Sequence, residues 1–262
     1  MSRLLIFGLG YSAKRIAAEL ETRGFVWRGT GSDGDLDFED EDGMRAELAK
    51  ADHVLSSVPP GDEDDPVLAR YGDALDGKWL SYLSSTGVYG DAGGAWVDEH
   101  SPTGDGRRKA RAEADARWLD LGARVFRLPG IYGPGRSPFD RVREGKAHRI
   151  DRPGQVFSRV HVDDIAGGVA AAIVANVPAG AYNLGDDVPA PQADVIAEAC
   201  RLLGFEIPPL EPLDEASMSP MARAFYAENR RVANGRLKRM ADWAPLYPSY
   251  REGLRAVLAA GG

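Results

Sequence analysis

Short, unbroken apolar runs alternate with stretches of helical spacing through the first half of the chain. Strands are predicted at 3–7, 25–30, 52–58, 79–84 and 123–128. The segment 11–23, between the first two strands, places Ile16, Ala17 and Leu20 on one side of a predicted helix, which Gly24 ends. Runs that are apolar on both faces are typical of parallel strands covered by helices. The alternation therefore predicts βαβ units and a doubly wound, Rossmann-like α/β fold.

A further helix is predicted after residue 105, with a packing stripe formed by Ala110, Ala114, Trp118 and Leu121. The segment after Leu128, "PGIYGPGRSP", is rich in glycine and proline and is predicted to be a loop. The remaining predicted elements are a strand end and helix at 161–175, a strand at 180–184, and helices at 192–203, near 218–230, at 235–240 and at 250–258. Asp163 or Asp164 is the expected N-cap of the first of these helices.

The first strand runs into Gly8-Leu9-Gly10-Tyr11-Ser12-Ala13, a G-x-G-x-x-A pattern placed directly between a strand and a helix. The first glycine permits a tight turn, the second lets backbone approach a pyrophosphate, and Ala13 allows close packing of helix on strand. The helix start, with Tyr11 and Ser12, supplies partial positive charge. This placement predicts dinucleotide binding, and the alternative is a glycine turn made only for packing.

Acidic residues dominate the segment after the second strand, where seven acids and no base lie between Asp33 and Asp42. An acid at this place bonds the ribose 2′-hydroxyl of NAD, whereas the 2′-phosphate of NADP needs Arg or Lys. NAD is therefore the expected cofactor, with Ser32 and Asp33 beside its ribose. NADP stays open if Arg28, or Lys14 and Arg15, turn toward a phosphate.

The overall charge and the cysteine count exclude several classes of protein. With a net charge of -8, the chain has no excess of Lys and Arg for nucleic acid or for a membrane surface. Its single cysteine, Cys200, forms no internal disulfide, so a reduced, cytoplasmic compartment is expected. Four histidines without paired spacing argue against a metal site. A small molecule is the expected partner.

Five segments, "GLGYSA", "LSSTGVYG", "RLPGIYGPGR", "VHVDDIAGGV" and "YNLGDD", occur in this order. With them the chain resembles the extended short-chain dehydrogenase/reductase superfamily, and within it the atypical, NAD-dependent epimerase/dehydratase-like branch. The resemblance implies an NAD(P)-binding Rossmann-like domain of residues 1–132 and 155–188, and a smaller substrate-covering domain of residues 133–154 and 189–262. It also implies a possible homodimer.

The resemblance further implies a catalytic Ser or Thr together with a Y-x-x-x-K pair. The Ser position falls on Ser85, with Thr86 as a near alternative, and it would hold the reacting oxygen. The lysine falls on Lys109, which would bind the nicotinamide ribose. The tyrosine, normally the acid or base, then falls on Asp105.

This departure matters because a neighbouring cation lowers the pKa of a tyrosine toward neutrality, yet keeps a carboxylate ionised. Asp105 would be a poor acid unless burial raised its pKa by several units. The chemistry is then carried by Tyr89, by Tyr132 or by Asp105 in an unusual role, or there is little chemistry. Tyr89 and Tyr132 are also explained as structural rings of their turns.

Further contacts are implied where family members touch the cofactor. These positions are Ser57, Val58, Pro59, Leu128, Pro129 and Ile131. Between Pro134 and Val160 seven Arg and Lys face three acids, a surplus that favours an anionic substrate or else a solvated face. In nucleotide-sugar members an arginine before the histidine binds a substrate phosphate. Here Phe157 takes that place, so Arg136 or Arg159 is the candidate contact, beside Tyr132.

The sequence therefore predicts an epimerase/dehydratase-like oxidoreductase that transfers hydride between NAD(P) and a sugar-like substrate, which includes nucleotide sugars. The alternative is a catalytically silent NAD(P)-binding sensor or regulatory protein of the same fold. A simple reductase that uses another acid is a third reading.

Overall fold

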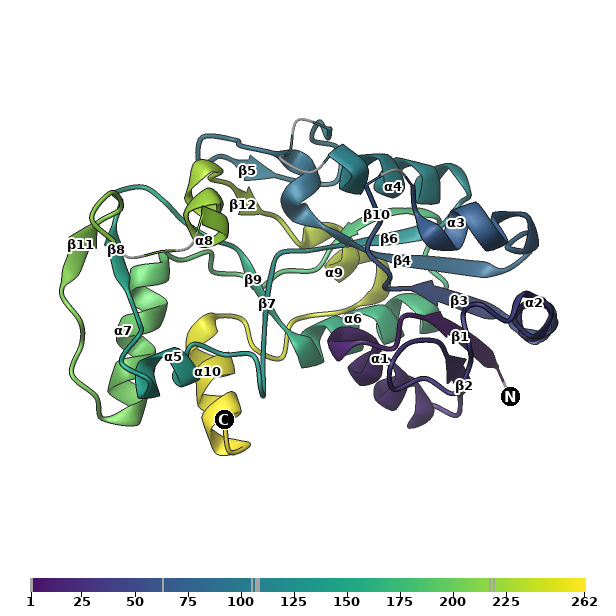
Figure 1. The fold of residues 1–262 in the computed structure, drawn as a ribbon, viewed down its shortest axis with the longest axis horizontal. Helices are drawn as coiled ribbons and strands as arrows, with labels where there is room; N and C mark the ends of the chain where they lie inside the picture. The colour runs from purple at the N-terminus through teal and green to yellow at the C-terminus, as the bar shows by residue number, and fades with distance from the viewer. Residues whose placement is uncertain (1, 63, 105, 107–108, 217, 219) are drawn as a thin grey trace.

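The centre of the molecule is a six-stranded parallel sheet with the strand order β10-β6-β4-β3-β1-β2 (Figure 1). Its strands are β1 (Arg3–Phe7), β2 (Val26–Gly29), β3 (His53–Ser56), β4 (Trp79–Ser85), β6 (Arg124–Leu128) and β10 (Gly180–Asn183). The computed structural model describes the chain except residues 1, 63, 105, 107–108, 217 and 219. The predicted α/β class and parallel sheet are confirmed.

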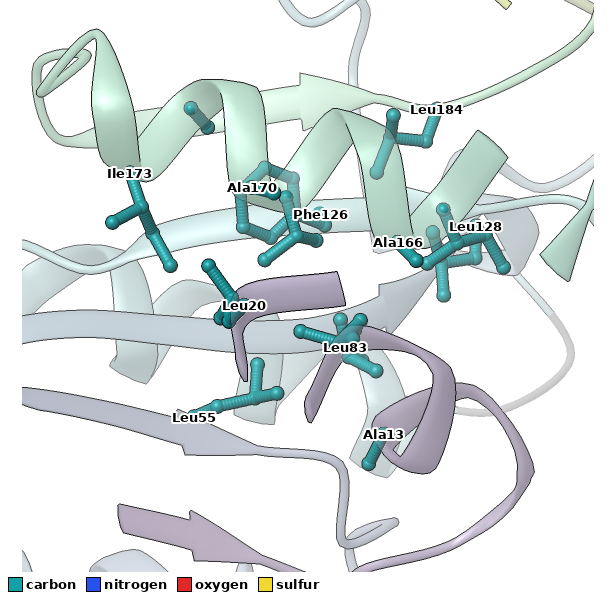
Figure 2. Close-up of a cluster of buried hydrophobic side chains, with 14 of the residues drawn as sticks. Ala13, Leu20, Leu55, Leu83, Phe126, Leu128, Ala166, Ala170, Ile173 and Leu184 are labelled. Atoms are coloured by element: carbon teal, nitrogen blue, oxygen red, sulfur yellow. The ribbon is translucent and has the colours of Figure 1, made fainter. Parts of the chain in front are cut away.

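One face of the sheet is covered by α1 (Tyr11–Glu21), α6 (Val162–Val174) and α9 (Gly235–Ala241). Figure 2 shows Leu20 of α1 and Ala170 of α6 within the buried cluster that also holds Phe126 of β6. The predicted face of α1 is correct, since Ile16, Ala17 and Leu20 are all buried. Burial of such aliphatic side chains is the main stabilising contribution to this layer.

The opposite face carries α2 (Glu41–Lys50), α3 (Pro66–Tyr71) and α4 (Lys109–Asp120). Asp40 caps α2 through the backbone N–H of Gly43, and Asp65 caps α3 through the N–H groups of Val67 and Leu68. Short 3-10 turns follow α3 and β4, namely η1 (Gly72–Ala74) and η2 (Thr86–Tyr89). Asp40 and Asp65, two acids of the segments that follow β2 and β3, therefore serve as helix caps.

The remaining elements lie beyond the carboxyl ends of the sheet strands (Figure 1). They are α5 (Phe139–Arg143), α7 (Gln192–Leu203), α8 (Pro220–Ala224), η3 (Phe225–Ala227) and α10 (Tyr250–Ala259), with the strand pairs β5 (Trp96–Val97) and β12 (Arg231–Val232), β7 (Gly130–Tyr132) and β9 (Arg159–His161), and β8 (Arg149–Asp151) and β11 (Leu210–Pro212). A separate buried cluster joins Phe139, Ile196 and Leu254. Cys200 is buried in this cluster, as its position in an apolar pattern predicts.

Three local predictions are wrong. The segment after Leu128 is not all loop, because Gly130–Tyr132 forms β7 and pairs in parallel with β9. The N-cap of α6 is His161, whose Nδ1 accepts from the N–H of Asp163, rather than Asp163 or Asp164. Leu121 lies one residue beyond α4 and is 46% exposed, so the packing stripe ends at Trp118.

The two expected domains interleave in the structure. Leu237 of α9 and Trp243 belong to the buried cluster of the main sheet, although both lie in the segment expected to cover the substrate. Likewise, β12 pairs with β5. In the part of the chain that the structure describes, no helix is both long and apolar enough to span a bilayer.

Candidate functional site

The carboxyl ends of four neighbouring strands bring the predicted site residues to one edge of the sheet. Gly8 follows β1, Ser57 follows β3, Ser85 ends β4 and Pro129 follows β6, in the order in which these strands pair. From β1 the chain goes to β2 on one side and later to β3 on the other. Ligands of open α/β sheets bind at such a reversal of strand order.

Gly8 makes the turn between β1 and α1 with a φ of +82°, a conformation that suits glycine. A Cβ added there would lie 2.9 Å from Cγ2 of Val58. Its backbone N–H donates to Oγ1 of Thr30 over 3.0 Å, and the N–H of Leu9 donates to the carbonyl of Thr30 over 2.7 Å. The role predicted for Gly8 in the turn is therefore confirmed by its backbone.

The backbone N–H groups that follow differ in whether they have an acceptor within the turn. The N–H of Gly10 donates to the carbonyl of Gly8 over 2.8 Å. Helix α1 begins at Tyr11 without a side-chain cap, and the first-turn amides of a helix have no acceptor within it. Tyr11 and Ser12 are thus the residues that offer amides to a phosphate. Gly10 is exposed, and a Cβ added there meets no atom within 4 Å.

Two contacts hold this turn in place. The hydroxyl of Ser57 donates to the carbonyl of Gly8, which fixes the end of β3 against the turn. Ala13 of α1 is 1% exposed and belongs to the buried cluster of the main sheet, as the close approach of helix and strand requires. Val58 is half-buried, while Pro59 is exposed.

The segment after β2 carries the predicted ribose-binding residues Ser32 and Asp33, and both are exposed. Asp33 forms an ion pair with Lys14 of α1. Arg28 is held by Asp35 over 2.7 Å and by Glu47 over 3.1 Å.

Arg15, the other base considered for a 2′-phosphate, lies 3.3 Å from Asp163. All three bases that would favour NADP are therefore already paired with carboxylates.

Ser85 is half-buried at the end of β4, where its Oγ accepts from the N–H of Gly87 over 3.1 Å and caps η2. A hydroxyl that accepts this bond can still donate its proton. The preceding Ser84 instead faces inward and donates to Asp115. Thr86, the alternative, is 4% exposed. Ser85 is therefore better placed than Thr86 to donate to a substrate oxygen.

A buried polar network lies directly beneath this turn. Arg127 of β6 forms a two-pronged ion pair with Asp115 of α4, with N–O distances of 2.7 and 3.1 Å. Its third nitrogen donates to the hydroxyl of Tyr89 over 3.0 Å, and that hydroxyl donates to Oδ1 of Asn183 over 2.7 Å. The phenol of Tyr89 therefore donates its only proton to Asn183, which does not support its predicted catalytic role.

Sequence reasoning missed Arg127, Asp115 and Asn183. One signal was present, because Arg127 interrupts the apolar run "ARVFRL" of a strand expected to be buried. A charge inside such a strand needs a partner.

The structure describes the lysine of the predicted Y-x-x-x-K pair. Lys109 is the first residue of α4 and is exposed. Asp105 lies outside the described residues, so its assignment stays a prediction.

The predicted substrate residues differ in burial and in the partners they contact. Arg159 is 7% exposed and donates to the carbonyls of Phe157 and Ala190 and to Gln192, which makes it a structural residue rather than a phosphate contact. Tyr132 is buried against Gly253 of α10, and its hydroxyl lies 3.5 Å from the carbonyl of Ser249. Arg136 is exposed.

Some of the other basic residues between Pro134 and Val160 also have a structural role. Arg149 donates to the carbonyls of Ala193 and Pro208. Of the predicted cofactor contacts after β6, Leu128 is buried and Ile131 is half-buried. Among the described residues, no cluster of three metal-ligating side chains occurs.

Two buried carboxyl groups lie where the sheet meets the C-terminal helices. Burial raises the pKa of Asp186 to about 8, against the opposing charge of Arg159. Burial also raises the pKa of Asp164 to about 7, although its carboxylate accepts from the N–H groups of Leu246 and Tyr247. Asp164 thereby ties the start of α6 to the segment that leads into α10.

Every one of the nine tyrosines has a pKa raised above its ordinary value, with burial as the largest cause. A catalytic phenol in a Y-x-x-x-K pair requires the opposite shift. Among the described residues, no neighbour therefore lowers the pKa of a tyrosine below its ordinary value.

Comparison with curated proteins finds a relative at moderate identity. The chain is 32% identical over 216 residues to a 3-diazoavenalumate denitrifying reductase of a Streptomyces species. The match covers 77% of this chain and 61% of that protein, so the chain spans about three fifths of the relative's length. No family model matches the sequence.

Solved structures agree with the fold over almost the whole chain. A functionally unknown conserved protein from Silicibacter pomeroyi is 40% identical with a TM-score of 0.89, and 99% of each chain is covered. The human epimerase family protein SDR39U1, solved with NADPH, is 18% identical with a TM-score of 0.78, covering 98% of this chain and 99% of that one. The UDP-glucose 4-epimerase of Thermus thermophilus, solved with NAD, is 20% identical with a TM-score of 0.71, covering 98% and 99%.

Proposed function

We propose that the chain belongs to the short-chain dehydrogenase/reductase superfamily, in its atypical, epimerase/dehydratase-like branch, and that it is an NAD(P)-dependent oxidoreductase, because its fold is that of epimerase structures solved with NADPH and NAD and its sequence is similar to a reductase. The observation that carries the proposal is the turn from β1 into α1. Open space above Gly10 and the first-turn amides of Tyr11 and Ser12 fit a dinucleotide pyrophosphate.

In this proposal, residues at the different strand ends have different roles. The amides of Tyr11 and Ser12 bind the pyrophosphate, and Ser57 holds the glycine turn in shape through its bond to Gly8. Lys109 binds the nicotinamide ribose, and Ser85 donates a hydrogen bond to the reacting oxygen. The nicotinamide supplies the hydride, or accepts it, when it is bound.

Proton transfer does not run through a phenol in this proposal. Tyr89 is bonded on both sides and Tyr132 is packed against α10. The proton therefore comes from solvent or from the Asp105 carboxyl group in an unusual role. A sugar-like substrate remains the proposed hydride partner, and a reductase reaction is equally compatible with the name of the Streptomyces relative.

A second candidate function is a sensor that binds NAD(P) without catalysis. The hydrogen bonds of Tyr89 to Arg127 and Asn183 favour it, because a chain without an available phenol would bind cofactor and turn over nothing.

One experiment separates these functions. The protein is titrated with NADH and NADPH by fluorescence, and the NAD-loaded protein is then incubated with nucleotide sugars while reduced cofactor is followed by absorbance. Turnover that falls in Ser85→Ala supports the oxidoreductase. Binding without turnover, and no effect of Ser85→Ala, supports the sensor. Failure to bind either dinucleotide refutes both.

The Gly10→Val variant is expected to weaken NADH binding by about 10–100-fold, which is roughly 1.4–2.8 kcal/mol. Its φ of -89° and ψ of -166° suit a branched residue, and no atom lies near the added Cβ, so the fold is expected to be retained. The side chain would instead occupy the space of the pyrophosphate. Isothermal titration and the melting temperature measure both effects, and equal affinity of the variant and the wild type contradicts the assignment.

NADH is expected to bind more tightly than NADPH to the wild type, because Asp33 repels a 2′-phosphate and engages Lys14. Asp33→Ser frees Lys14 and is expected to move the ratio of the two dissociation constants toward NADPH by about tenfold, or 1.4 kcal/mol. Asp37→Ser, an exposed acid of the same segment, is the matched control. A ratio that stays unchanged in Asp33→Ser would remove Asp33 from the ribose site.

A further inference from the structure

The turn between β7 and α5 presents an arginine to the same crevice. We propose that Arg136 binds the pyrophosphate of the dinucleotide, rather than a phosphate of the substrate. This inference rests on the proposed function, since it assigns one more residue to the cofactor site.

The backbone around Arg136 is a closed two-residue turn. Gly133 and Arg136 exchange both backbone hydrogen bonds, over 3.1 and 3.0 Å, with Pro134 and Gly135 between them. Gly135 has a φ of +72°, and proline followed by a glycine of positive φ is typical of a type II turn. The position of the Arg136 Cα is therefore fixed by the turn.

Tyr11 joins this turn to the glycine turn. Tyr11 is the first residue of α1, and its hydroxyl donates to the carbonyl of Pro134 over 3.0 Å. A Cβ added at Gly133 would lie 2.6 Å from that hydroxyl, so ring and turn are in close contact. The guanidinium carbon of Arg136 lies 5.9 Å from the centre of the Tyr11 ring. Arg136 is thus held beside the start of α1, where the amides face the crevice.

The basic residues near α1 differ in whether they form an ion pair. Lys14 is paired with Asp33, and Arg15 is paired with Asp163. For Arg136 no described carboxylate lies within ion-pair distance, and the residue is exposed. An arginine without a carboxylate partner can form a two-pronged bond with phosphate oxygens. Arg159, the other candidate anion contact, is committed to internal carbonyls.

The Arg136→Ala variant is expected to bind NADH and ADP-ribose about tenfold more weakly than the wild type, while adenosine, which lacks the pyrophosphate, binds equally to both. The salt dependence of ADP-ribose binding becomes shallower because one ionic contact is lost. Isothermal titration at two salt concentrations measures both effects. Arg136→Lys is expected to recover part of the affinity, since lysine keeps the charge without the planar fork.

Arg141→Ala is the matched control, because Arg141 is an exposed arginine of the same segment and lies on α5. It is expected to bind all three ligands like the wild type. Unchanged binding of NADH and ADP-ribose by Arg136→Ala overturns the proposal, as does a variant in which only substrate affinity falls. A wild type that binds no dinucleotide refutes the proposed function itself, which is a different result.

Discussion

The Arg127→Ala variant is expected to lose about 3–5 kcal/mol of its free energy of unfolding, the usual cost of breaking a buried ion pair. The side chains of Arg127 and Asp115 are only 4% and 2% exposed. Removal of the guanidinium leaves the Asp115 carboxylate buried without its counter-charge and takes one donor from Tyr89. Chemical denaturation followed by fluorescence measures the loss.

Arg117→Ala is the control for this prediction, because Arg117 pairs with Asp64 at the surface, where both side chains are about half-exposed. Exposed pairs contribute about 0–1 kcal/mol. The double variant Arg127→Met/Asp115→Leu is expected to be more stable than Arg127→Ala, since it leaves no buried charge. A loss below about 1 kcal/mol in Arg127→Ala would show that the network is not buried as described.

The contribution of Asp186 to the stability of the wild type is expected to fall as pH rises from about 4 to about 8. The pKa of Asp186 is raised to about 8 by burial, so the folded state holds a proton that the unfolded state has already released. Stability from such a group is complete below its unfolded pKa and is lost as pH rises through its folded pKa. One group contributes up to about 1.4 kcal/mol per pH unit across this window. Asp164, with a pKa raised to about 7, adds a second contribution.

Asp186→Asn is expected to flatten this slope, because the amide does not titrate. The slope is the quantity to compare, since above the pKa of Asp186 the substitution also removes a negative charge facing Arg159, and it changes the electrostatics of Tyr132 and Asp187 nearby. Unfolding free energies at several pH values between 4 and 9 measure it. Asp120→Asn, an exposed acid at the end of α4, serves as the control. Equal slopes in Asp186→Asn and the wild type would contradict the account.

Periodicity predicted the main sheet well because its strands are apolar on both faces and its helices carry one apolar side. The same reasoning missed β7, since Gly130–Tyr132 becomes a strand only by pairing with Arg159–His161, which lies far along the chain. Propensity describes local preference, and a distant partner overrode it here.

The glycine turn between β1 and α1 could be predicted from sequence more fully than the hydrogen bonds of the candidate catalytic residues. This turn depends on the small size and backbone freedom of its residues, which can be read from residue type: Gly8, Gly10 and Ala13. The role of Tyr89 depends instead on Arg127 and Asn183, which come from other strands. Whether the hydroxyl of Tyr89 is available for catalysis depends on these neighbours, and residue spacing along the chain does not predict them.

The N-cap of α6, His161, also could not be predicted from local sequence alone. Aspartate is one of the preferred N-cap residues, yet the ring nitrogen of His161 accepts that bond while Asp164 accepts from Leu246 and Tyr247. The choice depends on the segment leading into α10, which packs there only in the folded chain.

The most direct measurement for the central claim is the titration of the wild-type protein with NADH, followed by nicotinamide fluorescence, with ADP-ribose added as a competitor. We predict saturable binding of one NADH per chain that ADP-ribose displaces, because both ligands share the pyrophosphate that the start of α1 is shaped to hold. Absence of saturation, or NADH binding that ADP-ribose leaves unchanged, would contradict the claim.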